Sequence, residues 1–311
     1  MSTKLYTLVK KNVEEGKVGI VIQAGDNGTR LGADKPKPIV DLGNGETCLS
    51  KILDNIPERT SIFLHIQEKQ KEEYLEYLKK NVSHKFVYKL IQQEGYLYSQ
   101  EGKVKMIDGV PLRASNGPGS FGMGLKDIVE RLNLNIDYFS VYDGCKLGLH
   151  LDDITFGVEK MILEEKKMLA YTKFLNSSKL EEEVELKRRQ LAGEDCYPRY
   201  DRVFVNDVVE KRKLSEKLTG CAHIPALTGL NIFFYPAFIR RMPAVKGRKI
   251  EIKDYRGIPG MSYYYDFRIS GVINSHFKEE RLFVEQDKGH YVKSIKTPED
   301  LENYRKGRMI K

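Results

Sequence analysis

Val18-Gly19-Ile20-Val21-Ile22 leads directly into Gln23-Ala24-Gly25-Asp26-Asn27-Gly28-Thr29-Arg30-Leu31-Gly32. The first run is short, apolar and β-branched, which predicts a buried strand, and the second predicts a glycine-rich loop. Glycines let backbone N–H groups approach a polyphosphate without a Cβ clash, and Arg30 would add a bidentate positive charge. The loop is neither a P-loop, since no Gly-Lys-Ser/Thr follows, nor a dinucleotide fingerprint, since its glycine spacing differs. An isolated loop of this kind is more often a surface turn than a phosphate site.

Strand and helix patterns alternate after this loop. A helix is predicted over residues 47–55, a strand over 61–66, a helix over 68–81 and a strand over 86–91. A second glycine-rich loop, residues 115–120, precedes a predicted helix over 124–132 and a strand over 138–142 that ends at Asp143. This alternation predicts an α/β fold with a Rossmann-like mixed, mostly parallel sheet flanked by helices. Ligands of such sheets gather at the carboxyl ends of strands, where both glycine loops and Asp143 can converge.

The last third of the chain carries shorter signals. Strands are predicted around residues 203–210 and 230–235, and a hairpin is predicted from residues 281–285 and 291–295 around Asp287-Lys288-Gly289. A terminal helix is predicted to begin at Thr297-Pro298-Glu299-Asp300, because threonine caps helices, proline suits the first helical position and acids favour the first turn. The charged stretch 178–189 predicts a solvated helix.

Length and composition restrict the class of protein. The 311 residues can bury one substantial core, so we expect a single domain over 1–311, with 1–17 as an N-terminal extension and 252–311 as a C-terminal segment that closes the site. No apolar tract could cross a bilayer and residues 1–17 lack a secretory core, so we expect a cytoplasmic protein with no membrane partner. The net charge of +8 is spread over interleaved acids and bases, which suits polyphosphate substrates and gives no reason to expect nucleic acid. Four widely spaced cysteines predict neither a disulfide framework nor a zinc site.

Five short motifs together resemble one enzyme family. In chain order they are Gly28-Thr29-Arg30-Leu31-Gly32 with Pro36-Lys37; Ile91-Gln92-Gln93-Glu94-Gly95 with Ser99-Gln100-Glu101-Gly102-Lys103; Asn116-Gly117-Pro118-Gly119; Val208-Val209-Glu210 with Asn231-Ile232; and Val292 to Thr297 with Asp300-Leu301. This series resembles the sugar nucleotidyltransferases, in particular the branch containing the UDP-N-acetylglucosamine and UDP-glucose pyrophosphorylases. Each motif is only moderately specific, and their shared order from about Val18 to Leu301 carries the resemblance.

The resemblance implies a GT-A-like nucleotidyltransferase fold and a uridylyl transfer. A sugar 1-phosphate oxygen would attack the α-phosphorus of UTP, giving a UDP-sugar and pyrophosphate. Such a transfer needs positioning and charge neutralisation rather than a covalent nucleophile, and no residue is assigned that role. The implied partners are UTP and a sugar 1-phosphate, and the implied cofactor is Mg²⁺.

The resemblance also implies roles for single residues. Nucleotide binding falls to Ala24, Gly25, Gly28, Thr29, Asn116, Gly117 and Gln92, with Gln93 the alternative to Gln92; an amide can both donate and accept at the uracil edge. Asp143 would hold Mg²⁺, while Arg30, Lys37 and Lys296 would be catalytic cations on the phosphates. Glu210 and Asn231 would hydrogen-bond sugar hydroxyls. Outside this pattern the same residues are ordinary turn formers, surface lysines or solvated strand-edge residues.

Two features of the sequence leave alternatives open. Val208-Val209-Glu210 favours N-acetylglucosamine and the motif from Val292 favours glucose, so UDP-N-acetylglucosamine is the first expectation and UDP-glucose or another UDP-sugar the alternative. Asp26 stands where the family has a glycine, so its carboxylate must face solvent, bind metal or be neutralised by Arg30 or Lys37. If Asp26 is a lesion, the chain is an inactive homologue that binds nucleotide sugars; a basic RNA-binding module is a remoter reading. The sequence carries no signal for oligomeric state.

Overall fold

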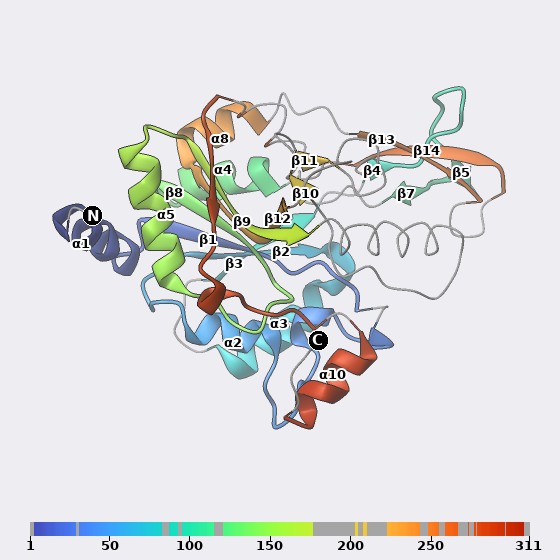
Figure 1. The fold of residues 1–311 in the computed structure, drawn as a ribbon. Helices are drawn as coiled ribbons and strands as arrows, with labels where there is room; N and C mark the ends of the chain where they lie inside the picture. Colours follow the sequence, from blue (N-terminus) through green and yellow to red (C-terminus); the bar gives the residue numbers. More distant parts are fainter. Residues whose placement is uncertain are drawn as a thin grey trace.

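Helices cover both faces of a mixed β-sheet in the computed structural model of the protein (Figure 1). The α/β fold predicted from the sequence is therefore confirmed. The structure describes residues 3–28, 31–82, 87–92, 95–114, 121–176, 203–204, 208–209, 223–242, 248–254, 259–266, 273, 277, 279–295 and 297–307. The helix predicted over 178–189 lies outside these ranges.

The central sheet has nine strands in the described part of the chain. They are β1 (Val18–Gln23), β2 (Ile62–Gln67), β3 (Val87–Gln92), β8 (Tyr138–Asp143), β9 (Met168–Asn176), β10 (Val203–Phe204), β11 (Val208–Val209), β12 (His223–Phe234) and β15 (Arg281–Glu285). Their order is β11-β10-β12-β8-β1-β2-β3, with β9 paired to β12 and β15 paired to β9. β8, β1, β2 and β3 are parallel, whereas β12 runs antiparallel to β8. The carboxyl ends of the four parallel strands therefore meet at one edge.

Two helical layers enclose the sheet. One contains α1 (Thr3–Glu14), α2 (Cys48–Asp54), α3 (Lys71–Asn81) and α5 (Leu151–Leu163), and the other contains α4 (Phe121–Arg131) and α8 (Tyr235–Arg241). Ile20 and Ile22 of β1 pack in the first layer and Val21 packs in the second, so both faces of β1 are buried. This burial explains the uninterrupted apolar run in its sequence. None of the described helices is long and apolar enough to pass through a membrane.

The N-terminal helix belongs to this packing. Val9 and Val13 of α1 are buried in the same apolar cluster as Ile154 and Val158 of α5. The predicted domain boundaries, with 1–17 as an extension and 252–311 as a closing segment, stay predictions.

Three short β-pairs extend the fold beyond the main sheet (Figure 1). They are β4 (Gly95–Tyr96) with β7 (Arg113–Ala114), β5 (Met106–Ile107) with β6 (Val110–Pro111), and β13 (Arg248–Lys253) with β14 (Met261–Asp266). The backbones of Tyr98 and Tyr263 exchange two hydrogen bonds of 2.8 and 2.9 Å, and their rings stack at 5.4 Å. This contact joins two segments that are far apart in the sequence.

The terminal helix begins as predicted. α10 spans Pro298–Arg305, and the Thr297 hydroxyl accepts the backbone N–H of Asp300 at 3.1 Å. The Asp300 carboxylate in turn accepts the Thr297 N–H at 2.9 Å, which completes a capping box. This box fixes the direction in which the chain enters α10.

The hairpin predicted from residues 281–285 and 291–295 is wrong. β15 pairs in parallel with β9, and residues 291–295 run instead beside the turn after β8, where the Leu147 N–H donates to the Lys293 carbonyl at 2.9 Å. β15 has its partner in β9, and Asp287 caps a 3-10 helix, η8 (Lys288–His290), which turns the chain away from β15. A hairpin would need a tight turn at this point.

We predict that Gly144→Ala destabilises the fold. The Gly144 N–H donates to the Gln23 carbonyl at 3.1 Å, and a Cβ at residue 144 would lie 2.7 Å from that oxygen. Backbone would have to move, so we expect denaturant unfolding to show a loss of about 1–3 kcal/mol. The control is Gly124→Ala in α4, where the added Cβ meets a Leu90 methyl at 3.3 Å and helix propensity improves. Equal stability of the two variants would contradict the close approach of β1 and the β8 turn.

Candidate active site

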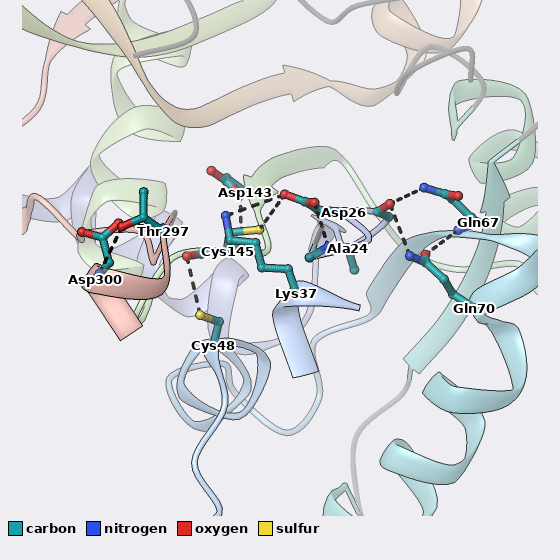
Figure 2. A network of polar contacts seen from close by, with 12 residues as sticks. Ala24, Asp26, Lys37, Cys48, Gln67, Gln70, Asp143, Cys145, Thr297 and Asp300 are labelled. Carbon is teal, nitrogen blue, oxygen red and sulfur yellow. Dashed lines mark hydrogen bonds and ion pairs between the residues drawn. The ribbon is translucent and has the colours of Figure 1, made fainter. Parts of the chain in front are cut away.

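The glycine loop leaves β1 at the carboxyl edge of the parallel strands (Figure 2). The Ala24 N–H donates to the His65 carbonyl at 2.9 Å, and the Ala24 carbonyl accepts the Tyr74 hydroxyl at 2.6 Å. Burial lowers the pKa of His65 to about 4 and raises the pKa of Tyr74 well above its ordinary value. Both side chains are therefore uncharged at neutral pH, and the base of the loop is fixed by the protonated Tyr74 hydroxyl and by the backbone carbonyl of His65.

Two glutamines hold the next residues of the loop. The Gln67 amide donates to the Gly25 carbonyl at 2.5 Å, and the buried Gln70 amide donates to the Asn27 side chain at 2.8 Å. The Gln70 oxygen also accepts the Gln67 N–H at 3.0 Å, so the two glutamines brace each other. Gln67 is the last residue of β2, and Gln70 is the last residue of the 3-10 helix that follows, η3 (Glu68–Gln70). The loop is thus preorganised from the side of β2.

Gly28 needs its missing side chain. Its φ is +70°, in the left-handed region, and a Cβ there would lie 2.8 Å from the Lys35 carbonyl oxygen. The Gly28 N–H donates to the Asp26 carboxylate at 3.1 Å. Gly28 is therefore required both for the turn and for the close approach of residues 35–37.

Asp26 is neutralised by Lys37. The Lys37 Nζ lies 3.7 Å from the Asp26 Oδ2, and the Lys37 N–H donates to the Asp26 carbonyl at 2.9 Å. Lys37 stands at the start of a short 3-10 helix, η2 (Lys37–Ile39), and its side chain is only 4% exposed. The sequence left the Asp26 carboxylate free to face solvent, to bind metal or to pair with a neighbouring cation. The structure shows an ion pair with Lys37.

Cys145 connects Asp26 with Asp143 (Figure 2). Its N–H donates to the Asp143 Oδ1 at 2.9 Å and its thiol lies 3.9 Å from the Asp26 Oδ2, while the Cys48 thiol donates to the Cys145 carbonyl at 3.6 Å. Burial raises the pKa of Cys48 to about 12 and raises that of Cys145 well above its ordinary value. Both thiols therefore stay protonated, as structural groups rather than nucleophiles. Sequence reasoning missed Cys145; its signal is its position in the turn after Asp143.

Asp143 ends β8 and is partly exposed. Within the described ranges no group of three or more His, Cys, Asp or Glu side chains could hold a metal ion. Mg²⁺ is commonly bound by one or two carboxylates together with waters and substrate phosphates. Asp143, partly exposed at the end of β8, fits the case of a single carboxylate, and the metal assignment stays a prediction.

Two amides share the sheet face of Asp143. Gln23 pairs with Asp143 across β1 and β8, and Asn231 of β12 pairs with Val141, two residues before Asp143 on the same face. The Gln23 Nε2 and the Asn231 Oδ1 are buried, and neither has a hydrogen-bond partner among the described residues. A buried unsatisfied polar group costs about 1–3 kcal/mol, so such groups call for an explanation, of which a ligand is one. Asn231 was predicted for the site, whereas Gln23 was missed; its signal is an amide at the end of an apolar run.

The other predicted site residues are placed in part. Gln92 ends β3, where its backbone pairs with Gln67 at the same sheet edge, but its side chain is outside the described atoms. Thr29, Arg30, Asn116, Gly117, Glu210 and Lys296 lie outside the described residues. The first and last motifs do meet, because their residues Leu31 and Ile295 are buried in one apolar cluster with Leu42.

No protein-family model matches the chain, and no curated protein matches it by sequence. Solved structures do. The UDP-N-acetylglucosamine pyrophosphorylase of Trypanosoma brucei, in complex with an inhibitor, superposes with a TM-score of 0.74 at 17% identity, over 97% of this chain and 67% of that one. A mutant UDP-glucose pyrophosphorylase of Leishmania major, in complex with UDP-glucose, superposes with a TM-score of 0.70 at 13% identity, over 94% of this chain and 66% of that one.

The chain has the fold of the UDP-sugar pyrophosphorylases. A proposed UDP-N-acetylglucosamine pyrophosphorylase of Entamoeba histolytica agrees, with a TM-score of 0.68 at 15% identity, over 95% of this chain and 80% of that one. The chain spans about two thirds of the length of the first two proteins. The predicted nucleotidyltransferase fold is confirmed, and at these identities the likeness concerns the fold alone.

We predict that Asn231→Leu stabilises the protein. Leucine has nearly the same shape and removes a buried oxygen that has no partner in the described structure, so the free energy of unfolding should rise by about 1 kcal/mol. The matched control is Gln70→Leu: Gln70 is as buried as Asn231, but its amide is hydrogen-bonded, and its loss should destabilise by about 1–3 kcal/mol. Denaturant unfolding of both variants measures the contrast. Destabilisation of both to the same extent would show that the Asn231 oxygen has a partner in the protein.

Proposed function

We propose that this protein transfers a uridylyl group from UTP to a sugar 1-phosphate and releases pyrophosphate, with N-acetylglucosamine 1-phosphate as the sugar substrate. UDP-glucose or another UDP-sugar is the alternative product. One observation carries the proposal: a glycine loop preorganised at the end of β1 lies beside Asp143 at the end of β8, on the fold of the UDP-sugar pyrophosphorylases. The order of the five sequence motifs supports the same reaction.

Each group of residues has a proposed role that follows from its chemistry. The loop from Ala24 to Thr29 receives the phosphates of UTP through its backbone N–H groups other than those of Ala24 and Gly28, which donate within the protein. Gln92, with Asn116 and Gly117, reads the uracil edge. Arg30, Lys37 and Lys296 neutralise charge that builds up on the phosphates during transfer. Asp143 holds Mg²⁺, which when bound supplies further positive charge at the α-phosphate.

Sugar recognition falls to the strands beside Asp143. Asn231 lies on the Asp143 face of the sheet with an unsatisfied buried oxygen, and a sugar hydroxyl or an N-acetyl N–H would satisfy it. Glu210 is the second sugar-binding residue in the motif series. An enzyme that keeps a polar group at a cost in stability gains selectivity, since a substrate that lacks the matching group leaves it unpaired.

The transfer is direct in this proposal. Both thiols near Asp143 are buried and protonated, and an in-line attack by the sugar phosphate needs positioning rather than a covalent intermediate. An inactive homologue that only binds nucleotide sugars is the second candidate, motivated by Asp26 in the phosphate loop. The ion pair between Asp26 and Lys37 weakens that motive, because the carboxylate does not stand uncompensated.

A pyrophosphate-release screen tests the reaction. The protein is incubated with Mg²⁺, each of UTP, ATP, GTP and CTP, and a panel of sugar 1-phosphates. We expect UTP to give the fastest release and N-acetylglucosamine 1-phosphate to exceed glucose 1-phosphate. Preference for a purine triphosphate would remove the uracil assignment, and tight UTP binding without any pyrophosphate release would favour the inactive homologue.

Asp143→Asn tests the metal assignment. The substitution keeps the shape of the side chain and an acceptor for the Cys145 N–H but removes the charge that would hold Mg²⁺. We expect turnover to fall by roughly 100- to 1,000-fold, on the scale of losing one major electrostatic contact, with thermal unfolding unchanged. Asp127→Asn is the control, because it removes a carboxylate that is 76% exposed on α4. Full activity of Asp143→Asn would place the metal elsewhere, and activity indifferent to a chelator would remove the Mg²⁺ requirement.

A further inference from the structure

A carboxylate covers the lysine that the proposed function assigns to the phosphates. The Lys37 side chain is 4% exposed and the Asp26 side chain is 34% exposed, with 3.7 Å between Nζ and Oδ2. Lys37 is thus the inner member of the pair and Asp26 the outer one. Figure 2 shows the Lys37 side chain extending to the Asp26 carboxylate.

The backbone builds this pair into the loop. The Asp26 Oδ1 accepts the Gly28 N–H at 3.1 Å, which fixes the carboxylate in a local turn. The Asp26 carbonyl accepts the Lys37 N–H at 2.9 Å, so the two main chains are also joined. The Cys145 thiol, at 3.9 Å from Oδ2, is a weak donor to the same oxygen that faces Lys37. The pair is therefore held in place by backbone hydrogen bonds as well as by the contact between the two side chains.

The charges of Asp26 and Lys37 determine how the pair responds to a bound triphosphate. A buried ammonium group without a counter-charge is costly, and Asp26 supplies that counter-charge when no ligand is bound. A triphosphate brings negatively charged oxygens to the same loop and thus to the same cation. Two anions around one lysine repel each other, so the carboxylate and the phosphate compete for it.

We propose that Asp26 is an internal anion that occupies Lys37 in the free protein and yields it to a phosphate group of the nucleotide. Asp26 then sets the nucleotide affinity: it keeps the buried lysine in place and weakens the binding of the triphosphate and of product pyrophosphate. It is a positioning residue, acting through Lys37. This inference rests on the proposed function, and it concerns a position where the resembling family has glycine.

Asp26→Asn isolates the charge. Asparagine keeps an oxygen for the Gly28 N–H but no longer competes for Lys37. We expect UTP and inorganic pyrophosphate to bind roughly tenfold more tightly, with a larger gain at low salt, while the thermal unfolding temperature falls because Lys37 loses its counter-charge. Calorimetric titration is carried out both with a chelator and with Mg²⁺. If Asp26 had only a structural role, Asp26→Asn would lower the unfolding temperature without tightening the binding of UTP or pyrophosphate.

Asp41→Asn is the matched control. The Asp41 carboxylate accepts the Gly43 N–H at 2.8 Å in a turn of the same kind, so its substitution removes one negative charge without touching Lys37. A double-mutant cycle with Lys37→Met supplies the second test. In the Lys37→Met background, Asp26→Asn should no longer tighten pyrophosphate binding, because there is no cation left to release.

The outcomes separate this inference from the proposed function. Unchanged or weaker pyrophosphate binding by Asp26→Asn in chelator would overturn the inference, even if the wild type turns over UTP. Weaker binding only in the presence of Mg²⁺ would also overturn it, since Asp26 would then be a metal ligand. Tighter pyrophosphate binding by Asp26→Asn in a protein that releases no pyrophosphate from any nucleoside triphosphate would support the inference and reject the enzyme.

Discussion

The parallel pairing of β1 with β8 is the interaction on which the rest of the site depends. Its register sets Gln23 opposite Asp143 at the carboxyl ends of both strands. Because Gly144 has no side chain, its N–H can donate to the Gln23 carbonyl. The same turn brings Cys145 into contact with the carboxylates of both Asp143 and Asp26. The glycine loop and the candidate metal ligand are therefore brought together by sheet geometry, before any side chain of the loop is considered.

The sequence predicts this part of the fold well, for a physical reason. β1 and β8 are buried on both faces, so β1 reads as a continuous apolar run and β8 as a largely apolar run that contains Ser140, and each ends at a polar residue. The start of α10 can be predicted equally well from the sequence, because Thr297 and Asp300 form the capping box with each other. Signals of this kind are local, and the structure confirms them. The choice among UDP-sugars has no such local signal, and motifs from two branches of the family point in different directions.

What the sequence does not predict depends on contacts between distant residues. Gln67 reaches Gly25 across 42 residues, and the Cys145 thiol reaches Asp26 across 119. Contacts between such distant residues leave no periodic pattern in the sequence. The residues that hold the loop in place were therefore not predicted, although the loop itself was. The hairpin near residue 288 failed for a related reason: β15 finds a partner in β9, and a short capped turn sends the following residues to the β8 turn instead. Tertiary pairing outweighed the local pattern.

Asp26 and Lys37 show why a departure from a family motif has to be read with its partner. A glycine at position 26 would remove one carboxylate from beside the buried Lys37 ammonium. An aspartate there, taken alone, would repel a triphosphate. Together they form a balanced pair that one backbone hydrogen bond also joins, so the effect of the residue at position 26 depends on Lys37. The carboxylate in the glycine loop is thus part of how this chain accommodates the buried Lys37 side chain, and it does not by itself mark a site that has lost its ligand.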